Sequence, residues 1–207
     1  MREAYDENNT ARDEHNEDLW IAEFWSDDVE NITFHPPARQ ISIAKQLIDQ
    51  NILDLEEALH LYLKVGFALN DAAVAAWKYE YMVMRPNVFI HEFIDPNFQT
   101  NLYRLVPCQN PTFPSYPSGH SCFAAAGVFI NFFGNRTRFT DRYHEDKTEF
   151  RGAPRSYPNI ESMINENAFS RVPLGVHMRM DCQAGVELGH PISSAINGYR
   201  LERRRGA

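Results

Sequence analysis

The sequence predicts an all-α protein: a bundle of about five to six helices joined by long functional loops. Two observations favour this fold class. Apolar residues recur at helical spacing in several segments, and no segment shows strand alternation of any length. The chain has 207 residues, of which 43% are hydrophobic, so it can form one domain with a sizeable core.

Helical spacing and proline breaks predict the elements in order. Residues 87–117 are rich in proline and lack periodicity, so we expect a long ordered loop, which in a compact domain usually carries function. Residues 135–158 are polar and irregular. Helices are expected over 13–26, 38–50, 53–84, 118–133, 160–170 and 175–199, the last one interrupted near Pro191.

The ends of the chain differ from its centre in composition. Residues 1–16 are rich in acidic and asparagine side chains with little to bury, so they are expected to be a disordered acidic tail. Residues 17–200 are expected to form a single helical-bundle catalytic domain. Residues 201–207 are expected to be a solvated basic tail.

Composition also excludes several classes of function. The net charge of −8 argues against a nucleic-acid partner, which would need a basic face. No run approaches the ~20 apolar residues of a membrane span, and the polar start lacks the apolar core of a signal peptide. We therefore expect a soluble protein, with the cytoplasm favoured. The three cysteines are too few for a disulfide scaffold.

The stretch from Pro117 to His120 has the layout of an anion site. Ser118 supplies a hydroxyl, Gly119 a bare backbone and His120 an imidazole, directly before an apolar run that is predicted to be helical. Unpaired N–H groups at a helix start point outward, and the helix dipole favours negative charge. A histidine beside such amides is placed to move protons.

Two cations are predicted near the end of the long helix. Lys78 and Arg85 are seven residues apart, close to two helical turns, so they would share a face. A solvated helix end is the simpler interpretation of either residue alone. The apolar residues around them argue against it, because a charge in an apolar setting needs a partner of opposite sign.

A third group lies further along the chain. Arg171 precedes His177 by six residues, and Asp181 follows His177 by four. On a helix that spacing places the carboxylate against the imidazole, which fixes the tautomer and raises the basicity of the other ring nitrogen. An ordinary surface pair is the alternative for this spacing alone. Combined, the three groups suit a trigonal-bipyramidal oxyanion held by cations and donors, with one histidine at each axial end.

These groups occur in the order K-x6-R-P, P-S-G-H and S-R-x5-H-x3-D. They resemble the three-part signature of the vanadium-dependent haloperoxidase and type 2 phosphatidic acid phosphatase superfamily. The flanking stretches Ile21 to Trp25 and Phe113 to Pro117 are similar to the catalytic half of soluble bacterial vanadium-dependent haloperoxidases. The resemblance runs from about residue 19 to about 197, and family haloperoxidases are usually much longer.

The resemblance implies a fold, a cofactor and a reaction. The fold would be the haloperoxidase helical bundle, the cofactor vanadate, and the reaction the oxidation of halide by hydrogen peroxide, with room for a small organic acceptor. By family role, His177 would coordinate vanadium, Asp181 would orient it and His120 would act as acid and base. The vanadate oxygens would be held by Lys78, Arg85, Ser118, Gly119 and Arg171.

Two other functions stay open. A soluble acid phosphatase would use the same site, with His177 attacking phosphorus and His120 protonating the leaving group. A non-catalytic remnant would only bind an oxyanion. The signature describes oxyanion binding and not the oxyanion, since phosphate can occupy the same site. The short chain also leaves bundle faces that a homo-oligomer would cover.

Overall fold

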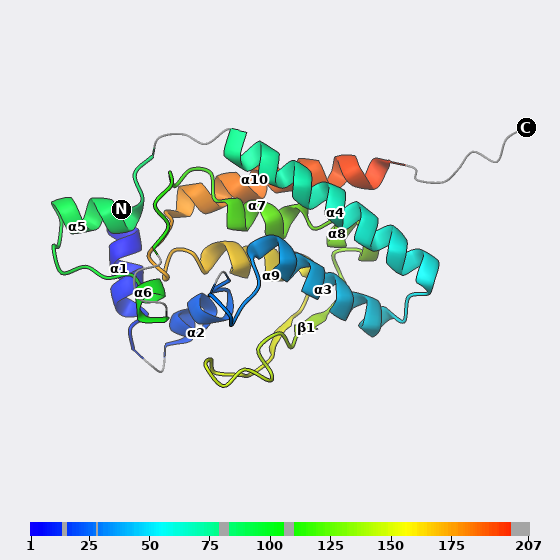
Figure 1. Ribbon diagram of the computed structural model, residues 1–207, viewed down its shortest axis with the longest axis horizontal. Helices are drawn as coiled ribbons and strands as arrows, with labels where there is room; N and C mark the ends of the chain where they lie inside the picture. Colours follow the sequence, from blue (N-terminus) through cyan, green and yellow to red (C-terminus); the bar gives the residue numbers. More distant parts are fainter. Residues whose placement is uncertain (14–15, 28, 79–82, 106–109, 200–207) are drawn as a thin grey trace, which may run out of the picture.

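The computed structural model describes residues 1–13, 16–27, 29–78, 83–105 and 110–199 (Figure 1). This part of the chain is mostly helical, with two three-residue strands, which confirms the all-α prediction. No helix within these ranges is long and apolar enough to cross a membrane. The basic tail expected at 201–207 lies outside the described residues.

Short helices occupy several segments that were expected to be loops, so there are more helices than the five or six predicted. The strands β1 (Phe139–Asp141) and β2 (Arg155–Tyr157) pair antiparallel. In chain order the helices are α1 (Arg2–Thr10), α2 (Glu17–Phe24), α3 (Pro36–Asn51), α4 (Leu55–Lys78), α5 (Pro86–Phe93), α6 (Asn101–Leu105), α7 (Gly119–Ala126), α8 (Phe129–Phe133), α9 (Ile160–Phe169) and α10 (Arg179–Gly198).

Helix α7 lies at the centre of the bundle, against α4, α9 and α10 (Figure 1). It is buried almost all round, because its run Cys122 to Ala126 combines small side chains with one phenylalanine. The main core joins this run to the inner faces of α3, α4 and α9 and to Phe24 and Trp25 at the end of α2. The N-terminus of α7, where the anion site was predicted, is therefore carried by the most enclosed helix of the bundle.

Two glycines let α10 lie directly on α7. A Cβ at Gly185 would fall 2.3 Å from the carbonyl oxygen of Ser118, and a Cβ at Gly189 would fall 2.5 Å from that of Cys122. Only glycine permits such a close approach to backbone. As a consequence the Ser118 N–H donates to the Asp181 carbonyl at 2.9 Å, which joins two of the predicted site segments.

The N-terminal segment differs from the disordered tail that was expected. Helix α1 buries Ala4 and is tied to the bundle through Asn8, whose side-chain amide donates to the Pro173 carbonyl at 3.1 Å. In return, the side-chain amide of Asn101 donates to the Asn8 carbonyl at 3.0 Å. These are contacts with distant parts of the chain, which composition alone does not reveal.

Three other boundaries also differ from prediction. The expected loop 87–117 contains α5, which begins at Pro86 because proline suits the first helical position, and α6. The helix expected over 118–133 is broken after Ala126, where Val128 adopts a left-handed conformation with φ of 58°. Pro191 lies inside α10 without interrupting it, and its ring is on the exposed side of the helix.

Candidate functional site

A cavity of about 460 Å³ opens at the N-terminus of α7. Five of the predicted site residues line it: Arg85, Gly119, His120, Arg171 and His177. They come from the start of α5, the start of α7 and the segment between α9 and α10. The remaining lining residues are Asp27, His35, Pro36, Pro37, Trp77, Leu102, Pro111, Phe113 and Phe123.

The contacts of His177 determine which ring nitrogen carries the proton. Nη1 of Arg85 lies 3.0 Å from Nε2 of His177, and a guanidinium can only donate, so Nε2 accepts. The proton of the neutral ring is then on Nδ1. That atom faces Ser115 Oγ at 3.4 Å and Asp181 Oδ2 at 3.5 Å, and the Ser115 hydroxyl donates to the same carboxylate oxygen at 2.5 Å.

The surroundings of His177 keep its ring neutral. Burial lowers its pKa to about 3, and the charges of Arg85 and Arg171 act in the same direction, while Asp181 opposes them. Near neutral pH the ring therefore presents an unprotonated Nε2 at the cavity. Such a nitrogen is a competent nucleophile or metal ligand.

Asp181 reaches His177 by a different geometry from the one predicted. Helix α10 begins at Arg179, so His177 lies before the helix and Asp181 lies in its first turn. The Asp181 carboxylate caps this turn, because Oδ2 accepts from the Met178 N–H at 2.8 Å. The carboxylate thus holds both the helix start and, with Ser115, the imidazole. Sequence reasoning missed Ser115, which had no partner at an indicative spacing.

Arg85 joins the two loops on either side of His177. Its guanidinium donates to the carbonyls of Phe113 at 2.9 Å, Pro114 at 3.2 Å and Val176 at 3.1 Å. It also lies over the Phe113 ring, with 4.5 Å between its central carbon and the ring centroid. The bonds to neutral carbonyls orient this buried cation at the cavity wall.

Arg171 supplies a second buried cation to the cavity. It follows α9, and its Nη1 donates to the Trp25 carbonyl at 3.1 Å. That bond ties the end of α2 to the cavity wall. Two guanidiniums therefore line one small space, which favours an anionic occupant.

His120 is paired with an acid that sequence reasoning missed. Its Nε2 lies 3.0 Å from Oδ2 of Asp27, and both side chains are buried. Neither oxygen of Asp27 meets hydrogen-bond geometry with the described residues, so the contact is chiefly one of charge. In the sequence, Asp27 could have been noticed only by its place two residues after the stretch Ile21 to Trp25.

Ser118 and Gly119 form the start of α7 in different ways. Ser118 is the N-cap: its hydroxyl oxygen accepts from the Ser121 N–H at 3.3 Å and from the Ser121 hydroxyl at 3.0 Å. It is fully buried and does not line the cavity. Gly119 does line it, and a Cβ there would meet only the Phe123 ring, at 3.9 Å. The Gly119 amide, which has no acceptor within the helix because it lies in the first turn, is thus placed at the cavity where it can donate to a ligand.

Lys78 is not brought into the cavity. It is the last residue of α4 and is exposed, whereas Arg85 caps the next helix, α5. The predicted shared helical face therefore does not form, and residues 79–82 between them lie outside the described part. Its neighbour Trp77 does line the cavity and packs edge-on against Phe123, with 6.4 Å between ring centroids.

The donors around the cavity fit an oxyanion. Two guanidiniums, a helix N-terminus and a neutral imidazole face one space, and a bare metal cation would be repelled by the guanidiniums. Within the described residues, no three side chains of the types His, Cys, Asp and Glu gather to hold a metal ion. The lining therefore suits an oxyanion, and the unprotonated Nε2 of His177 is the nitrogen at the cavity that is able to coordinate its central atom.

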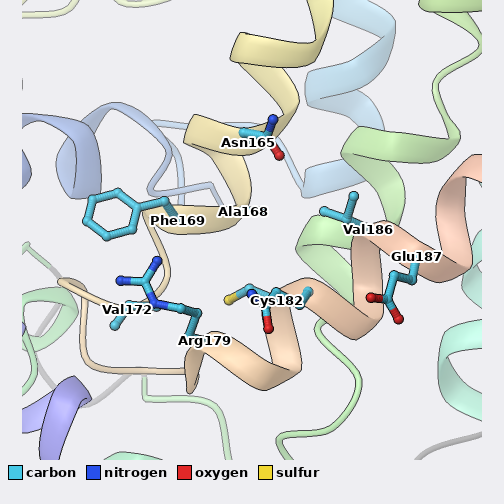
Figure 2. A pocket seen from close by; sticks show the side chains of 9 residues that line it. Asn165, Ala168, Phe169, Val172, Arg179, Cys182, Val186 and Glu187 are labelled. Carbon is cyan, nitrogen blue, oxygen red and sulfur yellow. The ribbon is translucent and has the colours of Figure 1, made fainter.

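A second cavity, of about 380 Å³, lies between α9 and α10 and contains none of the predicted site residues (Figure 2). Arg179, Phe169 and Cys182 are among its lining residues, and Arg179 lies over the Phe169 ring at 5.4 Å. Burial raises the pKa of the Cys182 thiol to about 12. The thiol is therefore protonated and unreactive, and this cavity offers no nucleophile.

Solved structures of vanadium enzymes share this fold. One is described as the first bacterial vanadium-dependent iodoperoxidase; it is 28% identical over 94% of this chain and 47% of its own, with a TM-score of 0.81. The holo- and apo-type structures of a bacterial vanadium-dependent chloroperoxidase are 18% and 16% identical, with TM-scores of 0.71 and 0.69. Each of these two matches covers 95% of this chain and 46% of the other, and at this identity they show the fold alone.

The chain thus spans about half the length of these relatives. A comparison with curated proteins finds no match. Residues 60–201 match the family described as the VCPO second helical-bundle domain, a range that includes Lys78, Arg85 and the segments from Pro117 to Asp181. The chain therefore belongs to the vanadium-dependent haloperoxidase and type 2 phosphatidic acid phosphatase superfamily.

Proposed function

We propose that this protein is a vanadate-dependent haloperoxidase that oxidises halide with hydrogen peroxide. The observation that carries the proposal is the buried, neutral His177, whose Nε2 faces a cavity lined by two guanidiniums. The 28% identity to a bacterial iodoperoxidase favours vanadate over phosphate as the oxyanion. A small organic acceptor of the oxidised halogen remains part of the proposal.

The residues that would hold vanadate follow from the cavity. His177 Nε2 would be the ligand of the metal, and Arg85, Arg171 and the Gly119 amide would hold its oxygens. Bound vanadate supplies a Lewis acid that activates hydrogen peroxide. The two guanidiniums neutralise the negative charge of an oxyanion, which a water-excluded site makes more effective.

Two members of the proposed set require movement. The exposed Lys78 side chain would have to turn past Trp77 toward the cavity. The Ser118 hydroxyl would have to rotate so that it donates into the cavity while its oxygen still accepts from Ser121. The Arg85 N–H that now contacts Nε2 would also have to be released, and its bonds to Phe113 and Pro114 would keep the guanidinium in place.

Ser115 and Asp181 would orient the ligand. They surround Nδ1–H of His177, which keeps the lone pair of Nε2 directed at the cavity. A tautomer with the proton on Nε2 could not bind the metal. Substituting either residue would therefore act through His177 and not through direct contact with substrate.

His120 would move the proton during turnover. Asp27, 3.0 Å from its Nε2, stabilises the charged imidazolium, so the pair can take up and return a proton at the cavity wall. Phe113 and Trp77 are the large apolar residues of the lining that remain partly exposed. They would limit the access of water and form the surface that halide and acceptor meet.

A paired assay tests the proposal. Bromination and iodination of an indicator would be measured with peroxide, with and without added vanadate, beside hydrolysis of an aryl phosphate. Halogenation that appears only with vanadate is the expected result. Phosphate hydrolysis that vanadate inhibits, with no halogenation, would instead establish a phosphatase. No activity in either assay, with no effect of vanadate on thermal stability, would indicate a non-catalytic oxyanion-binding remnant.

Two variants separate binding from proton transfer. His177→Ala should abolish the rise in melting temperature that vanadate produces, because the metal loses its protein ligand. His120→Ala should keep much of that rise and lose turnover. His91→Ala, at an exposed position on α5, is the matched control and should behave as the parent. Equal loss of vanadate affinity in the His120 and His177 variants would contradict the assigned roles.

A further inference from the structure

Helix α4 is apolar on two opposite faces. Its inner face buries Leu61, Val65, Ala68, Ala72 and Ala76 in the main core. Its outer face carries six large apolar side chains that are 46 to 76% exposed, which we call the outer stripe. The stripe consists of Leu55, Leu59, Leu63, Phe67, Val74 and Trp77.

The spacing of the outer stripe is that of one helical face. Its members follow one another at intervals of four, four, four, seven and three residues, which keeps them on the side opposite the core residues. A surface helix normally carries polar residues on this side, and a helix that is apolar all round is normally buried. In Figure 1, α4 runs along the outside of the bundle. The outer stripe is therefore expected to be covered by a partner.

Gly66 lies in the middle of the stripe, eleven residues from both Leu55 and Trp77. Glycine inside a helix is less favourable than alanine. No close approach among the residues that the structure describes explains it here, because a Cβ at Gly66 would meet nothing within 4 Å. A glycine at the centre of an apolar helical face does allow a second helix to cross closely at that point.

We infer that the outer stripe is the interface with a second copy of this chain, formed by two α4 helices that cross antiparallel at Gly66. A two-fold axis through Gly66 relates each residue to one equally far along the other copy. Leu55 then faces Trp77, and Leu59 faces the turn that carries Val74. Phe67 of each copy packs over the bare backbone at Gly66 of the other. The stripe is thus self-complementary about its own centre.

The available area suits a stable dimer. Six large side chains at this exposure present on the order of 600 Å² of apolar surface, against about 800 Å² per partner in a standard interface. A hollow of about 400 Å³ beside Phe67 is lined by Lys64, Asp71, Ile196 and Tyr199. It extends the same surface onto the end of α10.

The dimer would also bring the second copy next to the cavity of the candidate site. Trp77 belongs to both the outer stripe and the cavity lining. The first turn of α4 from the second copy would therefore lie at the rim of the cavity, with its Leu55 against Trp77. Because the chain spans about half the length of its relatives, a companion helical bundle is the competing occupant of the stripe.

The mass in solution tests the inference. Light scattering coupled to size exclusion, over a range of protein concentrations, should give twice the monomer mass of 24.0 kDa for the parent chain. Phe67→Glu should give the monomer, because it places a charge at the crossing point. Phe93→Glu, at a 67% exposed position on α5, is the matched control and should remain a dimer.

A second variant distinguishes an effect on dimerisation from an effect on folding. Gly66→Leu should weaken dimerisation by about tenfold or more, since it fills the crossing point. The circular dichroism and melting temperature of the dilute monomer should not fall, because the position is open within one copy. A parent that stays monomeric at all concentrations, or dimers that survive both stripe substitutions, would overturn the inference. A monomeric parent would favour the companion bundle as the occupant.

Discussion

Substitution of Gly185 by alanine should disturb stability and the candidate site together. Gly185 is where α10 lies on the backbone of α7, and the added Cβ would fall 2.3 Å from the Ser118 carbonyl oxygen and 2.9 Å from Ser121 Cβ. That carbonyl oxygen is backbone and cannot rotate away. Either α10 must move outward by about 1 Å or the turn that leads into α7 must shift.

The size of the effect follows from two opposing contributions. Overpacking of a closely packed interface costs about 1–3 kcal/mol, and a backbone atom as the obstacle points to the upper part of this range. Alanine recovers up to about 1 kcal/mol of helix propensity relative to glycine. We expect a net loss of about 2 kcal/mol in the free energy of unfolding, which lowers the melting temperature of a chain of this size by roughly 4–8 °C.

The assay is urea unfolding together with a vanadate titration followed by thermal stability. Gly198→Ala, in the same helix with nothing within 4 Å of the new Cβ, is the control and should leave both measurements nearly unchanged. Gly185→Ala should also weaken vanadate binding, because Ser118 carries Gly119 and His120. Parent-like stability and vanadate affinity in the Gly185 variant would refute the close-packing explanation.

Two further predictions concern a buried histidine and the serine beside His177. Burial, aided by the charge of Arg39, lowers the pKa of His144 to about 3, so the folded state stays neutral while the unfolded chain takes up a proton below about pH 6.5. The stabilisation of the fold by the neutral His144 ring is therefore complete above that pH and declines as the pH falls toward 3. His144→Phe should flatten the decline, measured by urea unfolding at about pH 7 and about pH 4.5, and an unchanged pH dependence would contradict this. Ser115→Ala should destabilise the fold by about 1–3 kcal/mol and weaken the vanadate-induced thermal shift, because Asp181 and His177 lose their bridging hydroxyl; a variant that retains the full shift would show that Ser115 does not orient the ring.

The site motifs could be found in the sequence because their residues are close together. Ser118, Gly119 and His120 are adjacent at a helix start, and only five residues lie between Arg171 and His177. Residue type and short spacing within the sequence are therefore enough to identify these candidate site residues. The cavity lining then contains five of the residues named in this way.

Long-range partners could not be found in the same way. Asp27 meets His120 and Ser115 meets His177 only because separate segments converge on the cavity. Ser115 has no partner at an indicative spacing, and nothing in the sequence near Asp27 points to His120. The helical tail at Arg2–Thr10 was missed for the same reason, since Asn8 is held by residues far along the chain.

The position of Lys78 shows how a correct spacing can predict the wrong local geometry. The seven-residue interval to Arg85 would place both on one face of a continuous helix, but residues 83–85 are not helical and Pro86 starts another helix. Proline restricts the residue before it to extended conformations. Lys78 and Arg85 therefore lie on either side of a break between two helices, and their seven-residue spacing does not reflect a shared helical face.

The sequence by itself determined the helical class, the three motif groups and the superfamily, because apolar periodicity and short-range spacing are properties of neighbouring residues. Only the tertiary structure decided which atoms meet. It set the proton of His177 on Nδ1 through Arg85, paired His120 with Asp27 and brought α10 onto α7 through Gly185. These contacts depend on how helices pack, and packing joins residues whose separation in the chain carries no signal.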